Sequence, residues 1–469
     1  MIFRLQKIYL KLTAALLAAV SFFQVQSYAD PSGGDGYFYL KQAQWLAQHG
    51  RFYHADYSFV FLPLALLSKM TGSVIAAYQI LTCLSYALIL YAFGFYIQWF
   101  LEPQLKKALP FVNILLLMLL SFQLPLHRLT FEFVKNGFAI ALFLMASTHL
   151  LKKNLKRALI IGLLAALTHK TVALFFLATL TGSLFSKSNH KKKMAVIATA
   201  FTGLAIILNP RLVNHFTNFL GNIRFEKFSS LITYNLHLTG WHVLLVFFWL
   251  VTALTQFFKI KKTLILNLEQ KLFLFVLFLA AIIPLLPIYG GVNAEIKWRL
   301  MIFSFCFAFL LFIVALSFIK NKKVLFANLL LTLILLAHQL LEPSGFPWIV
   351  ATSTQVPQVQ RLLEFVKSGE ELITHHGMEF YVDFKTPIRA KSLLTPGALP
   401  KYQLAYIPEF FLLNDDAADA IEQVKLLDIG PTYGLFYYED FQKLIKEFPI
   451  MNHWKNTFRV RPDFIQSYN

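Results

Sequence analysis

Charged residues are scarce in this chain of 469 residues. They make up 14% of the sequence, whereas hydrophobic residues make up 57%. A typical soluble domain carries about 25% charged residues, so this composition excludes an ordinary soluble protein and predicts a polytopic membrane protein. The net charge of +19 does not indicate a nucleic-acid partner, because the basic residues gather in short clusters between apolar runs. Such clusters are typical of cytoplasmic loops.

Cysteine is scarce too, and several catalytic motifs are lacking. The two cysteines, Cys83 and Cys306, lie inside apolar runs, which excludes a disulfide framework and predicts buried thiols. No P-loop, GxGxxG, HExxH or GxSxG motif occurs in the sequence. Nucleotide-driven and hydrolase chemistry therefore lack the motifs that would carry them.

Patterns of metal ligands are weak. His375 and His376 are adjacent in the sequence, so on a strand they would point to opposite faces, and with Asp383 they do not predict a metal site. We expect no cofactor. A divalent ion held by Asp30 and Asp35 is the alternative that the sequence leaves open.

Apolar runs of spanning length recur along the first three quarters of the chain. The first run, residues 8–29, follows Arg4 and Lys7 and resembles a signal peptide in outline, but its length favours an uncleaved first span. Further runs of about spanning length lie at 73–101, 110–126, 136–151, 194–208, 241–258, 270–288, 300–319 and 324–341.

Segment 158–185 decides the topology, because His169 and Lys170 divide it into two apolar halves. If the halves form a hairpin, every basic cluster falls on the cytoplasmic side, as the positive-inside rule requires. A re-entrant hairpin is the alternative. We expect an all-α polytopic domain with about eleven spans, with its N-terminus in the cytoplasm of a bacterial-type cell and its C-terminus outside the inner membrane. The clusters concerned lie at 106–107, 152–157, 187–193, 259–262 and 320–323.

The last part of the chain has a mixed composition. We predict a transmembrane domain over residues 1–341 and a small soluble α/β domain, outside the cytoplasm, over residues 342–469. Within the second domain the patterns predict amphipathic helices and strands bounded by glycine and proline. The helices are expected at 355–367 and 416–427, and the strands at 371–377, 402–408 and 433–439.

The stretch 30–63 is the first long polar break and forms the first outer loop of this topology. A Gly-Gly-Asp-Gly turn places Asp35 at the start of an amphipathic helix that carries Tyr37, Leu40 and Trp45. A helix of this kind suits the membrane interface beside a lipid substrate, with Asp35 as a candidate catalytic carboxylate. The alternative is that Asp35 only stabilises the first turn of the helix.

The other ionisable residues outside the cytoplasmic clusters fall on the same outer side. Such groups cost at least ~2.5 kcal/mol each at the centre of a membrane helix, so they usually pair or line a cavity. The candidates for contact with substrate are Asp30, Arg128, Glu132, Lys135, His169, Lys170, Glu295 and Arg299.

Each candidate has a structural alternative. Lys135 and Arg299 can extend to the membrane interface without touching substrate. Arg128 and Glu132 are spaced i, i+4 and can form an ion pair within one helix. The polar pair at positions 169–170 can serve only to solvate the tip of the hairpin.

Two stretches resemble known families. Residues 34–72, GDGYFYLKQAQWLAQHGRFYHADYSFVFLPLALLSKMTG, resemble the first extracytoplasmic loop of GT-C glycosyltransferases, with Asp35 at the place of the family's acid and a proline-containing entry at 61–64. Gly36 departs from this pattern, since many members have a second acid there. Residues 127–171 resemble membrane polysaccharide polymerases of the Wzy/EpsG type, in which an arginine precedes one helix and a histidine ends the next. Arg128 and His169 are the counterparts.

The GT-C resemblance implies transfer of a sugar from a polyprenyl-phosphate carrier to a glycan, lipid or protein acceptor at the outer face of the inner membrane. Asp35 would accept the proton of the acceptor hydroxyl, and a cation among residues 128, 135, 170 and 299 would hold the lipid phosphate. The nearest alternative is a lipid-linked oligosaccharide polymerase or ligase, which would depend on Arg128 and His169. The alternative from another class is a transporter or flippase, for which the sequence lacks related halves.

Overall fold

The structure is a computed structural model whose chain divides into two compact units. Unit 1 comprises residues 1–23, 57–64 and 78–345, and unit 2 comprises residues 24–56, 65–77 and 346–469. The structure describes residues 2–26, 34–53, 56–152, 154–169, 171–173, 175–177, 242–259, 268–286, 294–341, 359–374, 378–392, 400–406, 426–429 and 433–447, together with a few single positions between 192 and 225.

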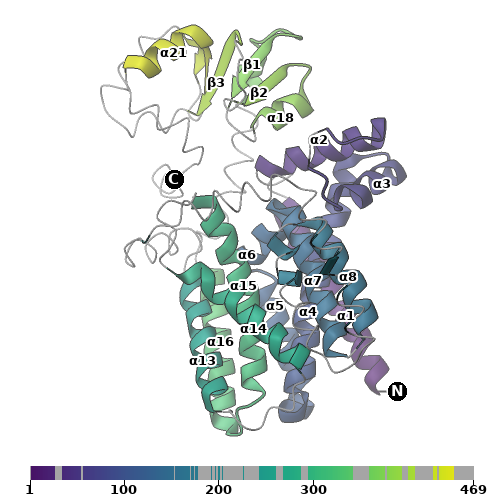
Figure 1. The fold of residues 1–469 in the computed structure, drawn as a ribbon. Coiled ribbons are helices and arrows are strands. Elements are labelled where there is room, and N and C mark those ends of the chain that lie inside the picture. Colours follow the sequence, from purple (N-terminus) through teal and green to yellow (C-terminus); the bar gives the residue numbers. More distant parts are fainter. Residues whose placement is uncertain are drawn as a thin grey trace. The chain divides into compact units, whose positions relative to one another are not determined.

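Unit 1 is helical in all the parts that the structure describes (Figure 1). Its helices follow the predicted apolar runs, apart from run 194–208, which lies almost wholly outside the described residues. In chain order they are α1 (Ile2–Gln26), α4 (Val74–Leu105), α5 (Leu109–Leu120), α6 (Leu124–His127), α7 (Val134–Leu151), α8 (Leu155–Thr168), α13 (His242–Lys259), α14 (Leu268–Ile282), α15 (Ala294–Leu316) and α16 (Lys322–Leu341), with short 3₁₀ turns at η1 (Lys106–Ala108) and η3 (Ile283–Leu285) and a π-helical turn at η2 (Arg128–Glu132). Helix α3 (Phe61–Thr71) joins the two units.

Two apolar stretches among the described residues are long enough to cross a membrane, Val74–Leu120 and Val134–Leu151. Shorter apolar helices cover parts of α1, α3, α13, α14 and α15. The predicted number of about eleven spans, and the sides on which the termini lie, stay predictions.

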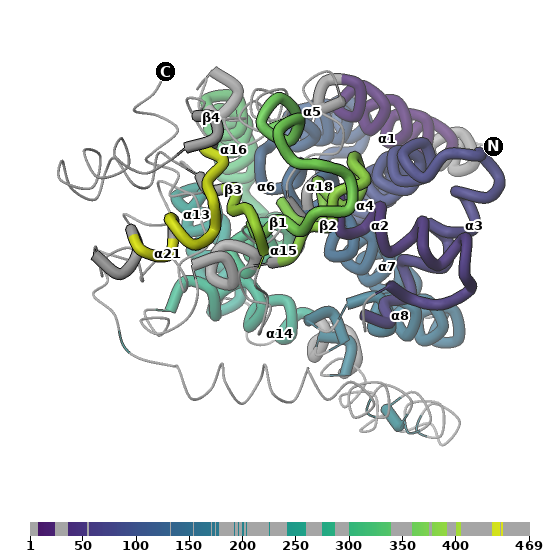
Figure 2. The backbone as a smooth tube through the Cα atoms, turned by 90° about the horizontal axis from the view of Figure 1, so that it is seen from above, coloured from purple at the N-terminus to yellow at the C-terminus, as the bar shows by residue number. Residues whose placement is uncertain are grey.

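Helix α15 forms the centre of the core of unit 1. Every residue from 301 to 316 is buried, including Cys306, as expected for a helix that is hydrophobic on all sides. The indole of Trp249 in α13 packs against Phe305 and Phe309, with ring centroids 5.2 Å apart in both pairs. Cys83, the other predicted buried thiol, is half-buried. Figure 2 shows α13, α15 and α16 grouped together in this unit.

Helices α7 and α8 form an antiparallel hairpin. Residues 152–154 connect them, and the Asn154 side chain caps α8 by accepting a hydrogen bond from the backbone N–H of Arg157 at 3.3 Å. The chain reverses again after His169, because the ring of Phe176 lies against Gly162 in α8. This reversal is the one that the hairpin interpretation of segment 158–185 predicts, and residues 178–185 lie outside the described part.

Unit 2 contains a five-stranded mixed sheet of order β2-β1-β3-β5-β4. Strands β1 (Glu371–Thr374), β2 (Arg389–Ser392) and β3 (Tyr402–Tyr406) are parallel, whereas β5 (Tyr433–Tyr437) is antiparallel to both β3 and β4 (Leu426–Ile429). Helix α18 (Met378–Lys385) makes the crossover from β1 to β2, and α21 (Tyr438–Glu447) follows β5. The unit also contains α2 (Gly34–His49), which packs on α18.

Three of these strands were predicted. Strands β1, β3 and β5 occupy the expected segments 371–377, 402–408 and 433–439. The predicted helix 416–427 is wrong at its end, because residues 426 and 427 belong to strand β4, and the rest of that segment lies outside the described residues. In segment 355–367 residues 359–363 are helical. The predicted division between 341 and 342 stays a prediction.

Candidate functional site

The polar stretch that follows α5 is the most unusual part of unit 1. It contains the single turn of α6 and the π-helical turn η2, and residues 125–131 are all buried. The sequence placed this stretch in an outer loop; the structure shows it buried among helices, and the side of the membrane on which it lies stays a prediction. Irregular backbone at membrane depth is tolerated where protein covers it or where it lines a water-filled cavity. Short π-helical turns frequently occur at functional sites.

Arg128 begins the π-helical turn, and only 4% of its surface is exposed. The backbone N–H of Phe133 donates to the Arg128 carbonyl at 3.0 Å, which closes the turn, and the guanidinium carbon lies 5.7 Å from the centre of the Phe133 ring. The ion pair between Arg128 and Glu132 stays an alternative, because residues four apart still lie on nearly one face of a π-helical turn and the Glu132 side chain is outside the described part.

Gly137 allows α7 to approach the π-helical turn closely. A Cβ atom at this position would lie 2.6 Å from the carbonyl oxygen of Leu129 and 2.9 Å from the Cα of Thr130. Real side chains do not adopt such distances to backbone atoms, so only glycine fits. The Gly137 N–H also donates to the Phe133 carbonyl at 2.8 Å. The first turn of α7, which contains the half-buried Lys135, is thereby fixed against the turn that contains Arg128.

His169 lies at the end of α8 in an extended conformation, with φ −147° and ψ 130°. The backbone N–H of Thr171 donates to its Nδ1 at 3.2 Å. The end of the first outer loop reaches the same place, because the Ser58 hydroxyl donates to the Thr168 carbonyl at 2.5 Å and the Phe59 N–H donates to the Leu167 carbonyl at 3.1 Å. His169 is half-buried there.

Arg128, Lys135 and His169 lie at one end of the α7–α8 hairpin. Helix α7 begins beside the π-helical turn, and the antiparallel α8 ends at that same end of the pair. The start of helix α4 lies at this same end, since the hydroxyl of Tyr78 near that start donates to the Phe131 carbonyl at 2.8 Å. Lys106 follows the other end of α4, about 40 Å further along the helix axis at 1.5 Å per residue. The structure therefore brings these three predicted residues to one end of unit 1, away from the basic residues after α4.

Asp35 lies in the first turn of α2, where the sequence predicted it, and belongs to unit 2. The predicted interfacial role of α2 is wrong for its aromatic face. Tyr37 and Leu40 are buried, and the Tyr37 ring packs against Tyr381 and Phe384 of α18, with centroids 4.9 and 6.0 Å away. The face that was expected to meet lipid is covered by a helix from the far end of the chain.

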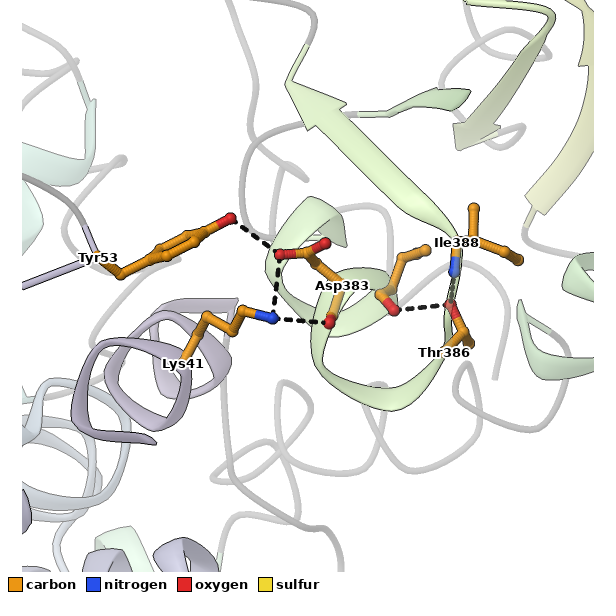
Figure 3. Close-up of polar contacts among 6 residues, drawn as sticks. Lys41, Tyr53, Asp383, Thr386 and Ile388 are labelled. Carbon is orange, nitrogen blue, oxygen red and sulfur yellow. Dashed lines mark hydrogen bonds and ion pairs between the residues drawn. The ribbon is translucent and has the colours of Figure 1, made fainter. Parts of the chain in front are cut away.

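A polar cluster fixes α2 to α18 (Figure 3). The Lys41 ammonium lies 3.3 Å from Oδ2 of Asp383 and donates to the Asp383 carbonyl at 3.0 Å, near the C-terminus of α18, where a cation is favoured. The Tyr53 hydroxyl donates to Oδ2 of Asp383 at 3.0 Å. Partial burial, then the negative charge of Asp383, raises the pKa of Tyr53 to about 12. Asp383 is thus a structural acid.

The remaining candidates are described only in part. Asp30 and Lys170 lie outside the described residues, and for Asp35, Glu132, Glu295 and Arg299 the backbone is described but the side chain is not. Among the described residues, no group of three or more His, Cys, Asp or Glu side chains is placed to hold a metal ion. Sequence reasoning missed the tyrosines of α4 that contact the π-helical turn, because tyrosines in an apolar run carry no signal of that contact.

The described part of unit 1 is an apolar helical body that has two stretches long enough to cross a membrane and a buried arginine at one end. Residues 9–350, well over half of the chain, match the sequence model of the EpsG family. The chain belongs to the EpsG family, and the resemblance of residues 127–171 to polymerases of the Wzy/EpsG type is thereby confirmed. Its fold is also similar, with a TM-score of 0.48 and 10% identity, to a crystal structure of ArnT from Cupriavidus metallidurans bound to undecaprenyl phosphate; the match covers 90% of this chain and 97% of that chain. No curated protein sequence matches it.

Proposed function

We propose that this protein is a membrane glycosyltransferase of the lipid-linked polymerase type. It would transfer a glycosyl group from a polyprenyl-phosphate or polyprenyl-diphosphate donor to a hydroxyl of a glycan acceptor. The observation that carries the proposal is the position of Arg128, 4% exposed and at the same end of the α7–α8 hairpin as His169. Family membership supports the same class of reaction, which was the nearest alternative in the sequence interpretation.

The proposed reaction places negative charge where a cation is needed. The acceptor oxygen forms a bond to the anomeric carbon, and the bond from that carbon to the phosphate oxygen breaks. The departing phosphate keeps the electron pair, and the hydroxyl proton goes to a base. The guanidinium of Arg128 is always charged and can bind phosphate through two parallel hydrogen bonds, so it suits the leaving group. Lys135, in the first turn of α7, would add a second positive charge.

His169 suits the phosphate better than it suits the role of base. Its Nδ1 accepts the Thr171 N–H, so in the neutral ring the proton is on Nε2. A protonated Nε2 donates a hydrogen bond, as a phosphate oxygen requires. The base is therefore sought elsewhere, and Asp35 in the first turn of α2 stays the proposed group for this role.

Matched arginine substitutions test the proposal. Purified protein is given a polyprenyl-linked donor, and formation of the extended glycan is followed. Arg128→Lys keeps the charge but loses the paired hydrogen bonds, so we expect a loss of about 10²–10³ in rate. Arg157→Lys is the control, since this exposed arginine lies at the other end of the same hairpin, and we expect less than a twofold change. Equal rates for both variants would exclude Arg128 from the site.

Two further variants separate the alternatives. Asp35→Asn should abolish transfer if Asp35 is the base. If Asp35→Asn keeps full activity and His169→Asn loses activity, the polymerase reaction uses a base other than Asp35. A transporter would move the lipid-linked glycan across proteoliposomes without extending it. Movement without any new glycosidic bond in the wild-type protein would refute the enzymatic function itself.

A further inference from the structure

Three buried donors converge on one backbone carbonyl, and one of them is His127, the residue before Arg128. The carbonyl of Ser121 accepts hydrogen bonds from the Tyr86 hydroxyl at 2.7 Å, from Nε2 of His127 at 2.7 Å and from the Ser21 hydroxyl at 2.8 Å. All four residues have no exposed surface. The donors come from α4, α6 and α1, so three separate helices meet at this oxygen.

The convergence exceeds what the end of a helix needs. Ser121 follows the last residue of α5, where carbonyls lack partners within the helix. A carbonyl oxygen has two lone pairs, and one donor is enough to satisfy it. Each polar group brought into an apolar interior costs free energy unless it is well paired. Three donors at this oxygen therefore indicate that the position of the following segment matters.

Tyr86 contacts the chain on both sides of Arg128. The Tyr86 ring packs edge-on against His127, the residue before Arg128, with centroids 5.7 Å apart, and against Phe131 within the turn at 5.4 Å. The Phe131 carbonyl accepts the hydroxyl of Tyr78, which lies eight residues earlier on the same face of α4. The residues that Tyr78 and Tyr86 hold, His127 and Phe131, thus lie on either side of Arg128 in the chain.

We propose that Tyr86 is a positioning residue that sets the location of the Arg128 guanidinium through the Ser121 carbonyl and the Phe131 ring. This role rests on the proposed function, in which Arg128 holds the phosphate of the lipid carrier. Displacement of a substrate-binding group by about 1 Å can cost about 10²-fold in rate. Loss of one of three bonds at Ser121 leaves the other two in place, so its effect on rate should be smaller.

A pair of buried tyrosines in α4 provides the test. Tyr86→Phe removes one donor to Ser121 and keeps the ring, while two donors still satisfy the carbonyl. Tyr96→Phe removes an equally buried hydroxyl, which donates to the Ser147 hydroxyl in α7 at 2.7 Å. We expect the rate of transfer to fall about tenfold in Tyr86→Phe and less than twofold in Tyr96→Phe, with similar losses of thermal stability. Equal rates in the two variants would overturn the proposal.

A second measurement separates positioning from general weakening of the fold. Binding of a short-chain polyprenyl phosphate to the detergent-solubilised full chain should weaken about tenfold in Tyr86→Phe. In an Arg128→Lys background the same substitution should change binding less than twofold, because the residue through which it acts has already been altered. An undiminished tenfold loss in that background would show that Tyr86 acts independently of Arg128.

The outcomes for the two proposals differ. If Arg128→Lys retains full activity and full binding, the proposed function of Arg128 fails and the positioning role fails with it. If Arg128→Lys loses activity while Tyr86→Phe behaves like Tyr96→Phe in both measurements, only the positioning role fails.

Discussion

The ion pair between Lys41 and Asp383 should control how firmly α2 is held on α18. Lys41→Met keeps the aliphatic part of the side chain and removes the ammonium that lies 3.3 Å from Oδ2 of Asp383 (Figure 3). The Asp383 carboxylate then keeps the hydroxyl of Tyr53 as a donor but loses its counter-charge. We expect a lower free energy of opening for the α2–α18 contact.

The magnitude follows from burial. Two unit charges 3.3 Å apart attract by about 5 kcal/mol at an effective dielectric constant of about 20, and desolvation offsets much of this attraction. Exposed pairs retain about 0.2–1 kcal/mol, whereas breaking a buried pair costs about 3–5 kcal/mol. The Lys41 and Asp383 side chains are 17% and 22% exposed, between these limits. A loss of about 1–3 kcal/mol is therefore expected.

Hydrogen exchange of the full chain measures this loss at the amides of α2 and α18. A loss of 1–3 kcal/mol accelerates exchange by about 5- to 160-fold. The double variant Lys41→Met/Asp383→Asn should lose less than the sum of the two single variants, because both remove the same interaction. Lys391→Met is the control, since its pair with Glu371 is about one-third exposed and should contribute no more than about 1 kcal/mol. Additive losses, or equal acceleration in the control, would refute the reasoning.

Two further predictions concern a glycine and a tyrosine. Gly137→Ala should destabilise the protein by about 1–2 kcal/mol and reduce transfer, because the backbone atoms of Leu129 cannot move away as a side chain would. Gly203→Ala is the control: its added Cβ meets no described atom within 4 Å, so thermal unfolding should show a neutral or stabilising effect. A Gly137→Ala variant as stable as the wild type would contradict the close approach. Tyr53 has a pKa raised from 10.0 to about 12, so its contribution to stability is complete below pH 10 and is lost as the pH rises toward 12. Asp383→Asn should lower this pKa without restoring 10.0, since burial remains, and a spectroscopic titration of the wild type minus Tyr53→Phe measures it; an unchanged pKa would mean that the Asp383 charge has no effect.

Periodicity predicted the elements whose environment is uniform. Residues 301–316 of α15 are almost all apolar and are all buried, and composition alone predicted an apolar helix of spanning length at 300–319. Strands β1, β3 and β5 have the short apolar pattern of buried strands, and turn residues mark their ends. Strand β2 was missed, because its sequence, Arg-Ala-Lys-Ser, is polar and has no strand pattern of its own. Its extended conformation is seen only through its pairing with β1.

Residues 127–137 show what pattern reasoning leaves open. Their polarity indicated an outer loop but not its partners, and the structure shows His127 and Arg128 buried, with contacts from α4 and α7 to the turn that contains them. Polarity reports what a residue would gain from water, but it does not report whether hydrogen-bond partners from other helices replace that water. A buried π-helical turn held by distant donors has no local sequence signature.

The sequence by itself determined that the chain is apolar and largely helical, with strands after the last apolar run, and it pointed to Arg128 and His169 through the pattern of the EpsG family. Only the tertiary structure decided which groups surround them. The donor Ser21 reaches Ser121 across 100 residues, and Lys41 reaches Asp383 across 342 residues. Local pattern fixes which residues avoid water, whereas the partners of buried polar groups depend on long-range packing, which no window of sequence contains.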